Sequence, residues 1–435
     1  MAGRTSLVCL ALCLAPVTLC AQTSPDLAKI LQRLDRLEQE NRALSEQVRA
    51  LQAQLGAPAA PPPTVEERLD IQQQRTEEQA QTKVEASQKF PIRLAGMALF
   101  NAFMNSKQSG GVDYPVTAAP TGPGHAGATV RQTIIGLEFG APQTLWGGKV
   151  NGSVYMDFFA GTNNSAFRIR TASIELAWKD RSVAAGLEKP IFNPREPSSL
   201  AQVGISPLTG AGNLWLWLPQ LRFEQEVHLG TNNGFRAQIG AVQTREIGPY
   251  AGTVTPEAAR PGLEGRVNFH HRLDDDRRLE IAAGFHTSTT HAAGVSIPSN
   301  VFQMDWFFNP WKRLEFSGVF YTGENVAHLG SGTRQGFAVY YNHGYALGSK
   351  GGWGQLTLHA LPRLDLHFFN GQVDDDNHDL GNGSIGKNLL FGGNAYFRLA
   401  PNVLMGLEAS QVRTTILGQG TRLNNHYDLA LAYLF

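Results

Sequence analysis

Hydrophobic and polar residues alternate along much of this chain, and the clearest example is the segment that ends it. One face of that segment is apolar, with an aromatic residue at each limit: Tyr427, Leu429, Leu431, Tyr433 and Phe435. The other face becomes polar away from the C-terminus: Leu434, Ala432, Ala430, Asp428 and His426. Alternation with this period predicts a β-strand between two unlike environments. An apolar face bounded by aromatic residues is typical of a strand that crosses a bilayer in a β-barrel.

Upstream segments alternate in the same way and carry charge on the face opposite the apolar one. A charged face needs water, because burying an unpaired charge is costly, so a wet lumen is predicted. The residues expected to line it are Arg168, Arg170, Arg222, Glu224, Glu226, Arg236, Glu264 and Arg266. Guanidinium groups suit phosphate or carboxylate, and the glutamates offset them in part, which predicts a weak preference for anions. Arg168 and Arg170 have no acidic residue beside them on their own face and are expected to be the screening pair.

The predicted fold class is all-β: a transmembrane antiparallel β-barrel of about 16 strands over residues 90–435. Short turns, one of them at residues 141–142, alternate with longer polar stretches such as residues 414–421. This is the asymmetry expected of periplasmic turns and outer loops. The count requires residues 324–352 to form one outer excursion, and about 18 strands is the alternative. A shift in the apolar face predicts a β-bulge near residues 171–173.

Residues 188–219 are long for a barrel connection and rich in proline and glycine. They are a candidate for a constriction loop that folds into the lumen. The charged residues of this loop are Glu188, Lys189, Arg195 and Glu196. Charged side chains at a narrow wet passage bias which ions pass. An ordinary surface loop is the alternative interpretation.

The N-terminus has the pattern of a secretory signal peptide over residues 1–21. Arg4 precedes an apolar run at residues 7–19, which is too short to span a membrane as a helix. A lipoprotein acylated at Cys20 is a weaker alternative, because the bulky Leu19 precedes that cysteine. All three cysteines lie in this segment: Cys9, Cys13 and Cys20. A mature chain without cysteine suits an oxidising periplasm and has no thiol chemistry.

The spacing of apolar residues in residues 22–56 predicts an N-terminal α-helical coiled coil. Apolar residues and one asparagine follow heptad spacing at Leu27, Ile30, Leu34, Leu37, Asn41, Leu44, Val48, Leu51 and Leu55. A single helix cannot bury such a stripe, so association with copies of the chain or with a partner is expected. Asn41 at an a position is compatible with a dimer, whereas the segment from Arg33 to Glu38 resembles trimeric coiled coils. A lone amphipathic helix is the remaining alternative. Residues 57–89 follow as a Pro/Ala-rich spacer and a polar helical linker.

Composition and motifs narrow the function further. Lys+Arg and Asp+Glu both number 37, which gives no electrostatic case for a nucleic-acid partner. No nucleophile–base pair is visible in the sequence, so the chain is not expected to be an enzyme. His270 and His271 point to opposite faces of one strand, and the acidic run at residues 374–379 is typical of a solvated outer loop. Neither a metal nor a cofactor is expected.

Short motifs scattered over most of the predicted barrel carry a family resemblance. They are Arg131-Gln132-Thr133, Gly136-Leu137-Glu138-Phe139, Asp157-Phe158-Phe159, Phe167-Arg168-Ile169-Arg170, Ala185-Gly186, Leu218-Pro219-Gln220-Leu221-Arg222-Phe223 and Gly351-Gly352-Trp353-Gly354-Gln355-Leu356. The pattern resembles DcaP-like porins of the phosphate-selective porin superfamily. The resemblance implies an N-terminal coiled coil followed by a trimeric barrel of sixteen strands, and it implies that small anionic solutes pass through the barrel.

Together these features predict a homotrimeric outer-membrane porin with its coiled coil in the periplasm. Small hydrophilic solutes, expected to be anionic, would diffuse passively through the charged lumen. The expected partners are outer-membrane lipid, the solutes and a periplasmic or cell-wall partner of the coil. The alternative is a structural tether of the envelope, in which the barrel only anchors the coil. The charged lumen favours the channel, because an anchor needs no wide polar interior.

Overall fold

The computed structural model describes residues 39–40, 42–47, 92–161, 165–249, 254–340 and 343–435 of a chain that divides into two units, residues 1–83 and 84–435. In the first unit, residues 39–40 and 42–47 are helical and exposed, and Leu44 is the one heptad residue among them. The other heptad residues, the leader and the spacer lie outside the described residues. Within the described part of the chain, no helix has the length and apolar character that a helical membrane crossing requires.

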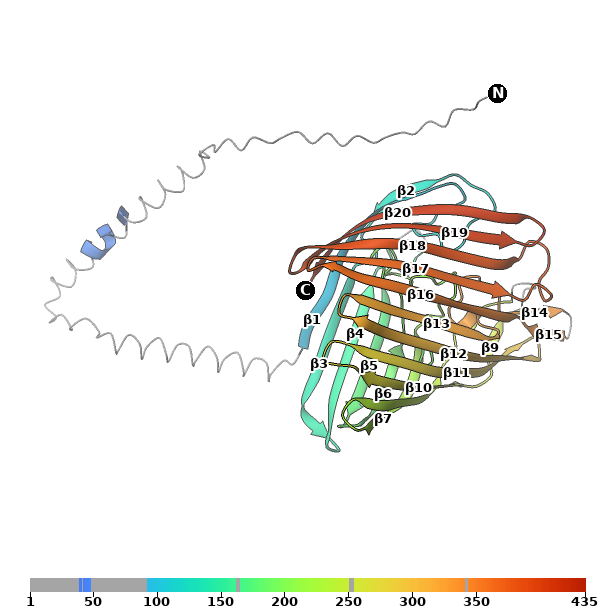
Figure 1. Ribbon diagram of the computed structural model, residues 1–435, viewed down its shortest axis with the longest axis horizontal. Coiled ribbons are helices and arrows are strands. Elements are labelled where there is room, and N and C mark those ends of the chain that lie inside the picture. Colours follow the sequence, from blue (N-terminus) through green and yellow to red (C-terminus); the bar gives the residue numbers. More distant parts are fainter. Residues whose placement is uncertain (1–38, 41, 48–91, 162–164, 250–253, 341–342) are drawn as a thin grey trace, which may run out of the picture. The chain divides into compact units, whose positions relative to one another are not determined.

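The second unit is a closed antiparallel barrel (Figure 1). Its wall consists of β1 (Ile92–Asn105), β3 (Ile134–Leu145), β4 (Gly148–Asp157), β5 (Arg168–Ala177), β6 (Arg181–Glu188), β7 (Leu218–Leu229), β8 (Asn233–Val242), β10 (Gly262–Arg272), β11 (Arg278–Ala292), β12 (Val295–Trp311), β13 (Leu314–Glu324), β16 (Gly348–Leu361), β17 (Leu364–Asp375), β18 (Ile385–Ala400), β19 (Val403–Ile416) and β20 (Gly420–Leu434). Each strand pairs with the next in this order. The last strand pairs with the first, with Met97 opposite Leu434 and Asn105 opposite His426.

Four further strands and one short helix belong to the connections. β2 (His125–Thr129) pairs with β1, and β9 (Pro256–Ala258) pairs with β11. Setting these two aside leaves 16 of the 18 strands of the main sheet in the closed wall, so the predicted strand number is confirmed. Residues 325–347 form one excursion that holds η1 (Ala327–Leu329) and a separate hairpin of β14 (Phe337–Tyr340) and β15 (His343–Ala346).

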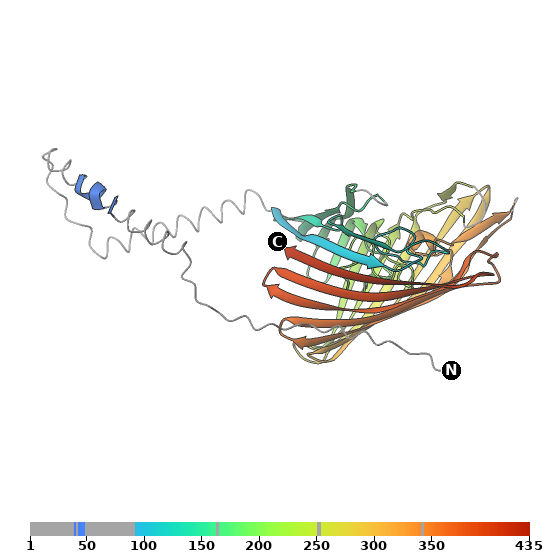
Figure 2. The same ribbon diagram turned by 90° about the horizontal axis from the view of Figure 1, so that it is seen from above.

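The two ends of the barrel differ in their connections (Figure 2). Both β1 and β20 have their chain-terminal ends at the end that carries the short turns, called here the turn end. The opposite loop end carries long connections, including residues 106–133, 189–217, 243–261 and 325–347.

Two of the predicted connections are wrong. β3 continues to Leu145, with a register shift between Gly140 and Thr144, and the turn falls at Trp146 and Gly147. Both turn residues have positive φ, 50° and 75°, which suits the twist of a tight hairpin. The predicted long stretch at residues 414–421 is instead a hairpin, with only residues 417–419 between β19 and β20.

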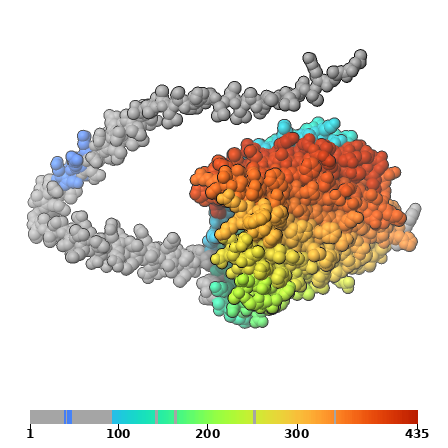
Figure 3. Space-filling model, in the orientation of Figure 1, coloured from blue at the N-terminus to red at the C-terminus, as the bar shows by residue number. Residues whose placement is uncertain are grey.

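The alternation read from the sequence becomes the two faces of the wall. On β20, the predicted apolar residues from Tyr427 to Tyr433 are exposed on the outside, and His426 and Asp428 are buried inside. The space-filling view shows the later strands as a continuous wall on this side of the barrel (Figure 3). An exposed apolar belt of this extent matches the lipid-facing surface of a transmembrane barrel.

The predicted β-bulge is present on β5, one residue before the expected range. Tyr155 is paired with Thr171 and Met156 with Ile169, which leaves Arg170 as the extra residue. Ile169 and Ile174 are both exposed on the outer face, although their sequence spacing is odd. The extra residue is therefore what restores the apolar face.

Candidate functional site

Residues 189–217, between β6 and β7, fold into the barrel and are called here the inserted loop. Ile191, Phe192 and Leu214 of this loop join one buried apolar cluster with inward residues of β8, β12, β13 and β17. Leu208 and Ala211 join a second cluster with inward residues of β13, β16, β17, β18 and β19. This stretch, which the sequence offered as a candidate constriction loop, therefore lies inside the barrel. Its apolar clusters fill part of the lumen that the sequence predicted to be wet.

Glycines on the inner wall let the inserted loop approach the strands. A Cβ atom at Gly371 on β17 would lie 2.2 Å from the carbonyl oxygen of Ala211. Gly212 has a φ of 96°, and a Cβ there would lie 2.4 Å from the backbone nitrogen of Gly352 on β16. Neither position has room for a side chain, so the backbone of the inserted loop lies directly against the backbone of the wall there.

Polar contacts join the middle of the inserted loop to strands far from β6 and β7. The Ser199 hydroxyl donates to Glu408 Oε2 on β19 over 2.6 Å. The Asn394 amide on β18 donates to the carbonyl oxygen of Ser198 over 2.8 Å, and the backbone N–H of Ser198 donates to Gln355 Oε1 on β16 over 2.7 Å. The loop therefore crosses the lumen and narrows it.

The charged residues predicted for the constriction are all engaged in ion pairs. Arg195 Nη2 lies 2.6 Å from Glu280 on β11, and its Nε lies 2.5 Å from Asp305 on β12. Lys189 Nζ lies 2.7 Å from Glu196 within the loop. Glu188 at the end of β6 lies 2.8 Å from Arg222 Nη1 on β7. These contacts hold the loop, so its charges are largely compensated where they stand.

The predicted screening pair is also compensated, which corrects the expectation that it has no acidic neighbour. Arg168 donates to both carboxylate oxygens of Asp157 at 2.8 and 2.9 Å, and Arg170 Nη1 donates to the same carboxylate at 2.8 Å. Both arginines also donate to the inserted loop, at the carbonyl oxygens of Gly204 and Val203. Asp157 is fully buried at the end of β4, and the bulge at Arg170 lets both guanidinium groups reach it.

The remaining predicted pore-lining residues all face inward but meet two different environments. Arg236 lies 3.3 Å from Glu224 and 3.0 Å from Glu226, in a cavity at the turn end. Arg266 and Glu264 are instead buried under the inserted loop: Arg266 binds Asp305, and Glu264 accepts the N–H of Ile191 over 2.7 Å. Of these five residues, Arg236, Glu224 and Glu226 line the turn-end cavity, and Arg266 and Glu264 do not.

Glu264 also takes part in an arrangement that the sequence did not reveal. His286 Nδ1 lies 3.0 Å from Glu264 Oε1, and His286 Nε2 lies 2.8 Å from the Ser288 hydroxyl, which is the pattern of a Ser–His–acid triad. All three side chains are buried, and the Phe192 ring of the inserted loop lies 5.9 Å from the His286 ring. A substrate has no access, so this network supports the loop rather than chemistry.

The same network continues into the outer connections through His328 of η1. Its Nε2 lies 3.4 Å from the Ser288 hydroxyl, and its Nδ1 lies 3.7 Å from Glu246, too far for a hydrogen bond. The Glu246 carboxylate instead accepts hydrogen bonds from Thr244 and Thr290. Burial, with His286 nearby, therefore lowers the pKa of His328 to about 3.

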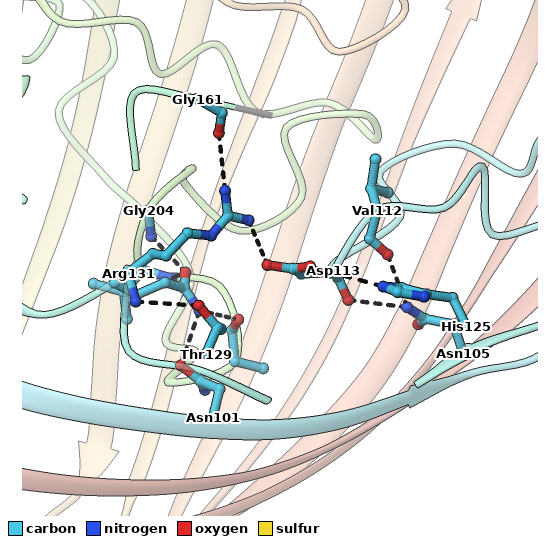
Figure 4. A network of polar contacts seen from close by, with 12 residues as sticks. Asn101, Asn105, Val112, Asp113, His125, Thr129, Arg131, Gly161 and Gly204 are labelled. Atoms are coloured by element: carbon cyan, nitrogen blue, oxygen red, sulfur yellow. Dashed lines mark hydrogen bonds and ion pairs between the residues drawn. The ribbon is translucent and has the colours of Figure 1, made fainter. Parts of the chain in front are cut away.

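The motif at residues 131–133 ties three connections together, as Figure 4 shows. The Arg131 guanidinium forms an ion pair with Asp113 and donates to the carbonyl oxygen of Gly161 over 2.9 Å. Gln132 Oε1 accepts the backbone N–H groups of Val203 and Gly204 at 2.7 and 2.6 Å. The role of these residues is to position the inserted loop.

Cavities remain on both sides of the inserted loop, with opposite charge. The turn-end cavity has a volume of about 820 Å³ and is lined by eight Asp and Glu residues and six Arg and Lys residues. Two loop-end cavities of about 540 and 550 Å³ share Arg168, Trp215, Leu216 and Arg245 in their lining. Arg334 and Glu246 also line the first of them. Basic residues thus predominate in the lining of these two cavities.

Several of these residues were missed in the sequence. Asp157 and Asp305 lie on strands, at positions where the alternation of inward and outward side chains places their carboxylates inside the barrel. The alternation could therefore have identified them. Arg245 and Arg334 lie in connections, where no alternation of polar and apolar residues indicates which way a side chain points. Among the described residues, no group of three or more His, Cys, Asp or Glu side chains is arranged to hold a metal ion.

The fold is that of a 16-stranded porin barrel, and solved structures share it. The chain is similar to the outer membrane channel DcaP of Acinetobacter baumannii, with a TM-score of 0.67 and 16% identity, over 79% of this chain and 97% of that one. It is also similar to an anion-selective porin from Comamonas acidovorans, with a TM-score of 0.57 and 12% identity, over 79% of this chain and 99% of that one. A third similar structure is the trimer form of OmpT, an outer membrane protein of Vibrio cholerae, with a TM-score of 0.51 and 9% identity, over 79% of this chain and 99% of that one.

At these identities the likeness shows the fold alone. At that level it confirms the resemblance to DcaP-like porins drawn from the sequence. No protein-family model and no curated protein sequence matches the chain.

Proposed function

We propose that this chain is an outer-membrane channel through which small hydrophilic solutes diffuse passively. The observation that carries this proposal is the inserted loop. It crosses the lumen and is held on the far wall by contacts such as Ser199 to Glu408, with charged cavities on both sides of it. A loop seated in this way narrows a passage, and a barrel that is only an anchor gains nothing from one. An outer membrane channel and an anion-selective porin share the fold, which agrees with the proposal.

The proposed solutes are anions. Arg168, Arg245 and Arg334 line a loop-end cavity together with one acidic residue, Glu246. The turn-end cavity has a small acidic excess, and the charges of the constriction are paired. We infer a weak anion preference that is set at the loop end, because fixed charge at the mouth of a passage raises the local concentration of the opposite ion.

The proposed assembly is a homotrimer with the loop end outside the cell and the coiled coil of residues 22–56 in the periplasm. The heptad residues call for association with further copies. A secretory leader over residues 1–21 would deliver the chain to the envelope. The exposed apolar belt of the barrel would contact outer-membrane lipid.

Planar-bilayer recording of the purified full chain tests the channel. We expect discrete conductance steps, and in a salt gradient a zero-current potential whose sign indicates that anions pass more readily. Replacing residues 198–214 by a short Gly/Ser linker should raise the conductance, because these residues occupy the lumen. A folded barrel that gives no conductance steps would reject the channel and favour the tether.

A further inference from the structure

We propose that the outer face of β17, β18, β19 and β20 binds a phosphate-bearing lipid, with Lys387 and Arg413 on the phosphate and an apolar cavity on the acyl chains. These strands form the orange-red part of the wall in Figure 3. The site lies outside the passage, so it goes beyond the proposed function and adds a lipid-binding surface to the barrel.

A cavity of about 880 Å³ is hollowed into the outside of the barrel wall. Its sides are exposed apolar side chains, among them Met104 on β1, Phe368 on β17 and Tyr427 on β20. Its floor includes Gly393 on β18 and Ala409 on β19, which are paired directly in the sheet. The large side chains around this floor leave a recess in the apolar belt, and a flexible acyl chain that fills it gains dispersion contacts.

Two basic side chains lie on the same outer face, between this cavity and the loop end. Lys387 on β18 is paired with Thr415 on β19, two positions beyond Arg413. Diagonal neighbours of this kind on one face of a sheet lie roughly 7–8 Å apart, so both side chains can reach one phosphate. Arg413 is four residues from Ala409 along β19, about 13 Å at the usual rise of a strand. A fatty acyl chain spans that distance.

The charges of this pair are available to a ligand. Lys387 and Arg413 are exposed, and among the described residues neither has an ion pair. Asp374 on β17 is the residue opposite Lys387, and it offsets only one of the two positive charges. Arg413 is held in place, because its Nε donates to Gln411 Oε1 over 2.6 Å and its guanidinium group lies 5.2 Å from the centre of the Phe391 ring. Its two terminal nitrogens remain to donate to a phosphate.

Amide side chains lie between the basic pair and the cavity. Gln411 on β19 donates to Asn425 on β20 over 2.7 Å, and Phe391 on β18 is paired with both Gln411 and Asn370. The outer face therefore changes from basic to amide to apolar along the strands. A phospholipid presents its phosphate, its ester groups and its acyl chains in the same order, and amides can donate to ester carbonyls. Inorganic phosphate would complement only the first of these three levels.

Native mass spectrometry of the full-length protein, released from detergent after lipid has been added, tests the proposal. The probe is dimyristoyl phosphatidate, and the matched control lipid is dimyristoyl phosphatidylcholine, which has the same chains and no net charge. Phosphatidate should bind at one molecule per chain and about tenfold more tightly, because two basic residues attract its anionic headgroup. K387Q/R413Q should remove this preference. R260Q, which removes an exposed arginine of the connection between β8 and β10, should keep it.

A second variant, A409F, fills the recess from an exposed position of the outer face, where the barrel should still fold. It should weaken the binding of both lipids. Equal binding of the two lipids by wild type, a preference that K387Q/R413Q leaves intact, or unchanged binding in A409F overturns the proposal. Displacement of phosphatidate by inorganic phosphate would assign the basic pair to a free anion, and wild type that retains no lipid would assign this face to another copy of the chain. Either result also overturns it.

Discussion

Arg195 in the inserted loop donates to Asp305 on β12 over 2.5 Å, and Arg266 on β10 donates to the same carboxylate twice at 2.8 Å. Asp305 is fully buried, so one carboxylate compensates two guanidinium groups away from bulk water. Removing one partner of a buried pair leaves an uncompensated charge. Asp305 therefore anchors the inserted loop to the wall of the barrel.

The substitution D305N tests this role. It should destabilise the seated loop by about 3 kcal/mol or more, because Arg266 loses its counterion and Arg195 keeps only Glu280. The expected result is a larger and noisier single-channel conductance in planar bilayers. K189A is the control, since Lys189 pairs with Glu196 at a partly exposed position, where such pairs contribute less than about 1 kcal/mol. Equal conductance in wild type and D305N would contradict the assignment.

The trio of Asp157, Arg168 and Arg170 predicts selectivity changes of opposite sign. D157N leaves two guanidinium groups without a counterion and should move the zero-current potential toward greater anion preference. The double substitution R168A/R170A leaves the carboxylate alone and should move it toward cations. The measurement is the zero-current potential in a salt gradient for each variant, with R260Q as a neutral control. Shifts of the same sign would show that the trio does not act through charge.

Burial of His328 predicts a dependence of the outer connections on pH. The pKa of this histidine is lowered to about 3 in the fold, from an ordinary value of 6.5. Between these values the unfolded segment binds more protons, so the seated state loses stability as pH falls below about 6.5, by roughly 1.4 kcal/mol per pH unit. Only His286 and Glu246 of the titratable groups named above face this ring.

Hydrogen exchange of residues 325–340 at pH 7.5 and pH 4.5 measures the effect. The protection factor, which is the intrinsic exchange rate at that pH divided by the observed rate, should be smaller at the lower pH in wild type, and H328Q should flatten the difference. H378Q, which changes an exposed histidine of another outer connection, should behave as wild type does. An unchanged pH dependence in H328Q would exclude His328 as its source.

The heptad stripe predicts that a peptide of residues 22–56 associates by itself. The pattern from Arg33 to Glu38 favours three strands, and replacing Asn41 by Ile should raise the melting temperature because a buried amide at an a position costs stability. Sedimentation equilibrium determines the oligomeric state. A peptide with both Leu34 and Leu37 replaced by Lys should be monomeric, and a monomeric or dimeric wild-type peptide would reject the trimer.

Much of the barrel could be predicted because each strand carries its own information. A lipid-facing and a lumen-facing side require different residues, and the strand period places them alternately along the chain. For this reason β20, the strand number and even the bulge at Arg170 were predictable. The turn at Trp146 was not, because Ala141 and Pro142 resemble a turn locally while the pairing of β3 with β4 continues past them.

The sequence by itself determined which side chains of each strand face inward, and it determined that residues 188–219 differ from an ordinary turn. Only the tertiary structure decided what those inward charges meet. Ser199 and Glu408 are 209 positions apart, and Arg195 and Asp305 are 110 apart. Contacts at such separations depend on the closure of the whole barrel, which no local period records. The arginines that the sequence predicted to line a wet lumen, such as Arg168, are instead paired with carboxylates. Arg245 and Arg334 lie in connections, where strand alternation assigns no direction, and the described residues contain no ion pair of either side chain.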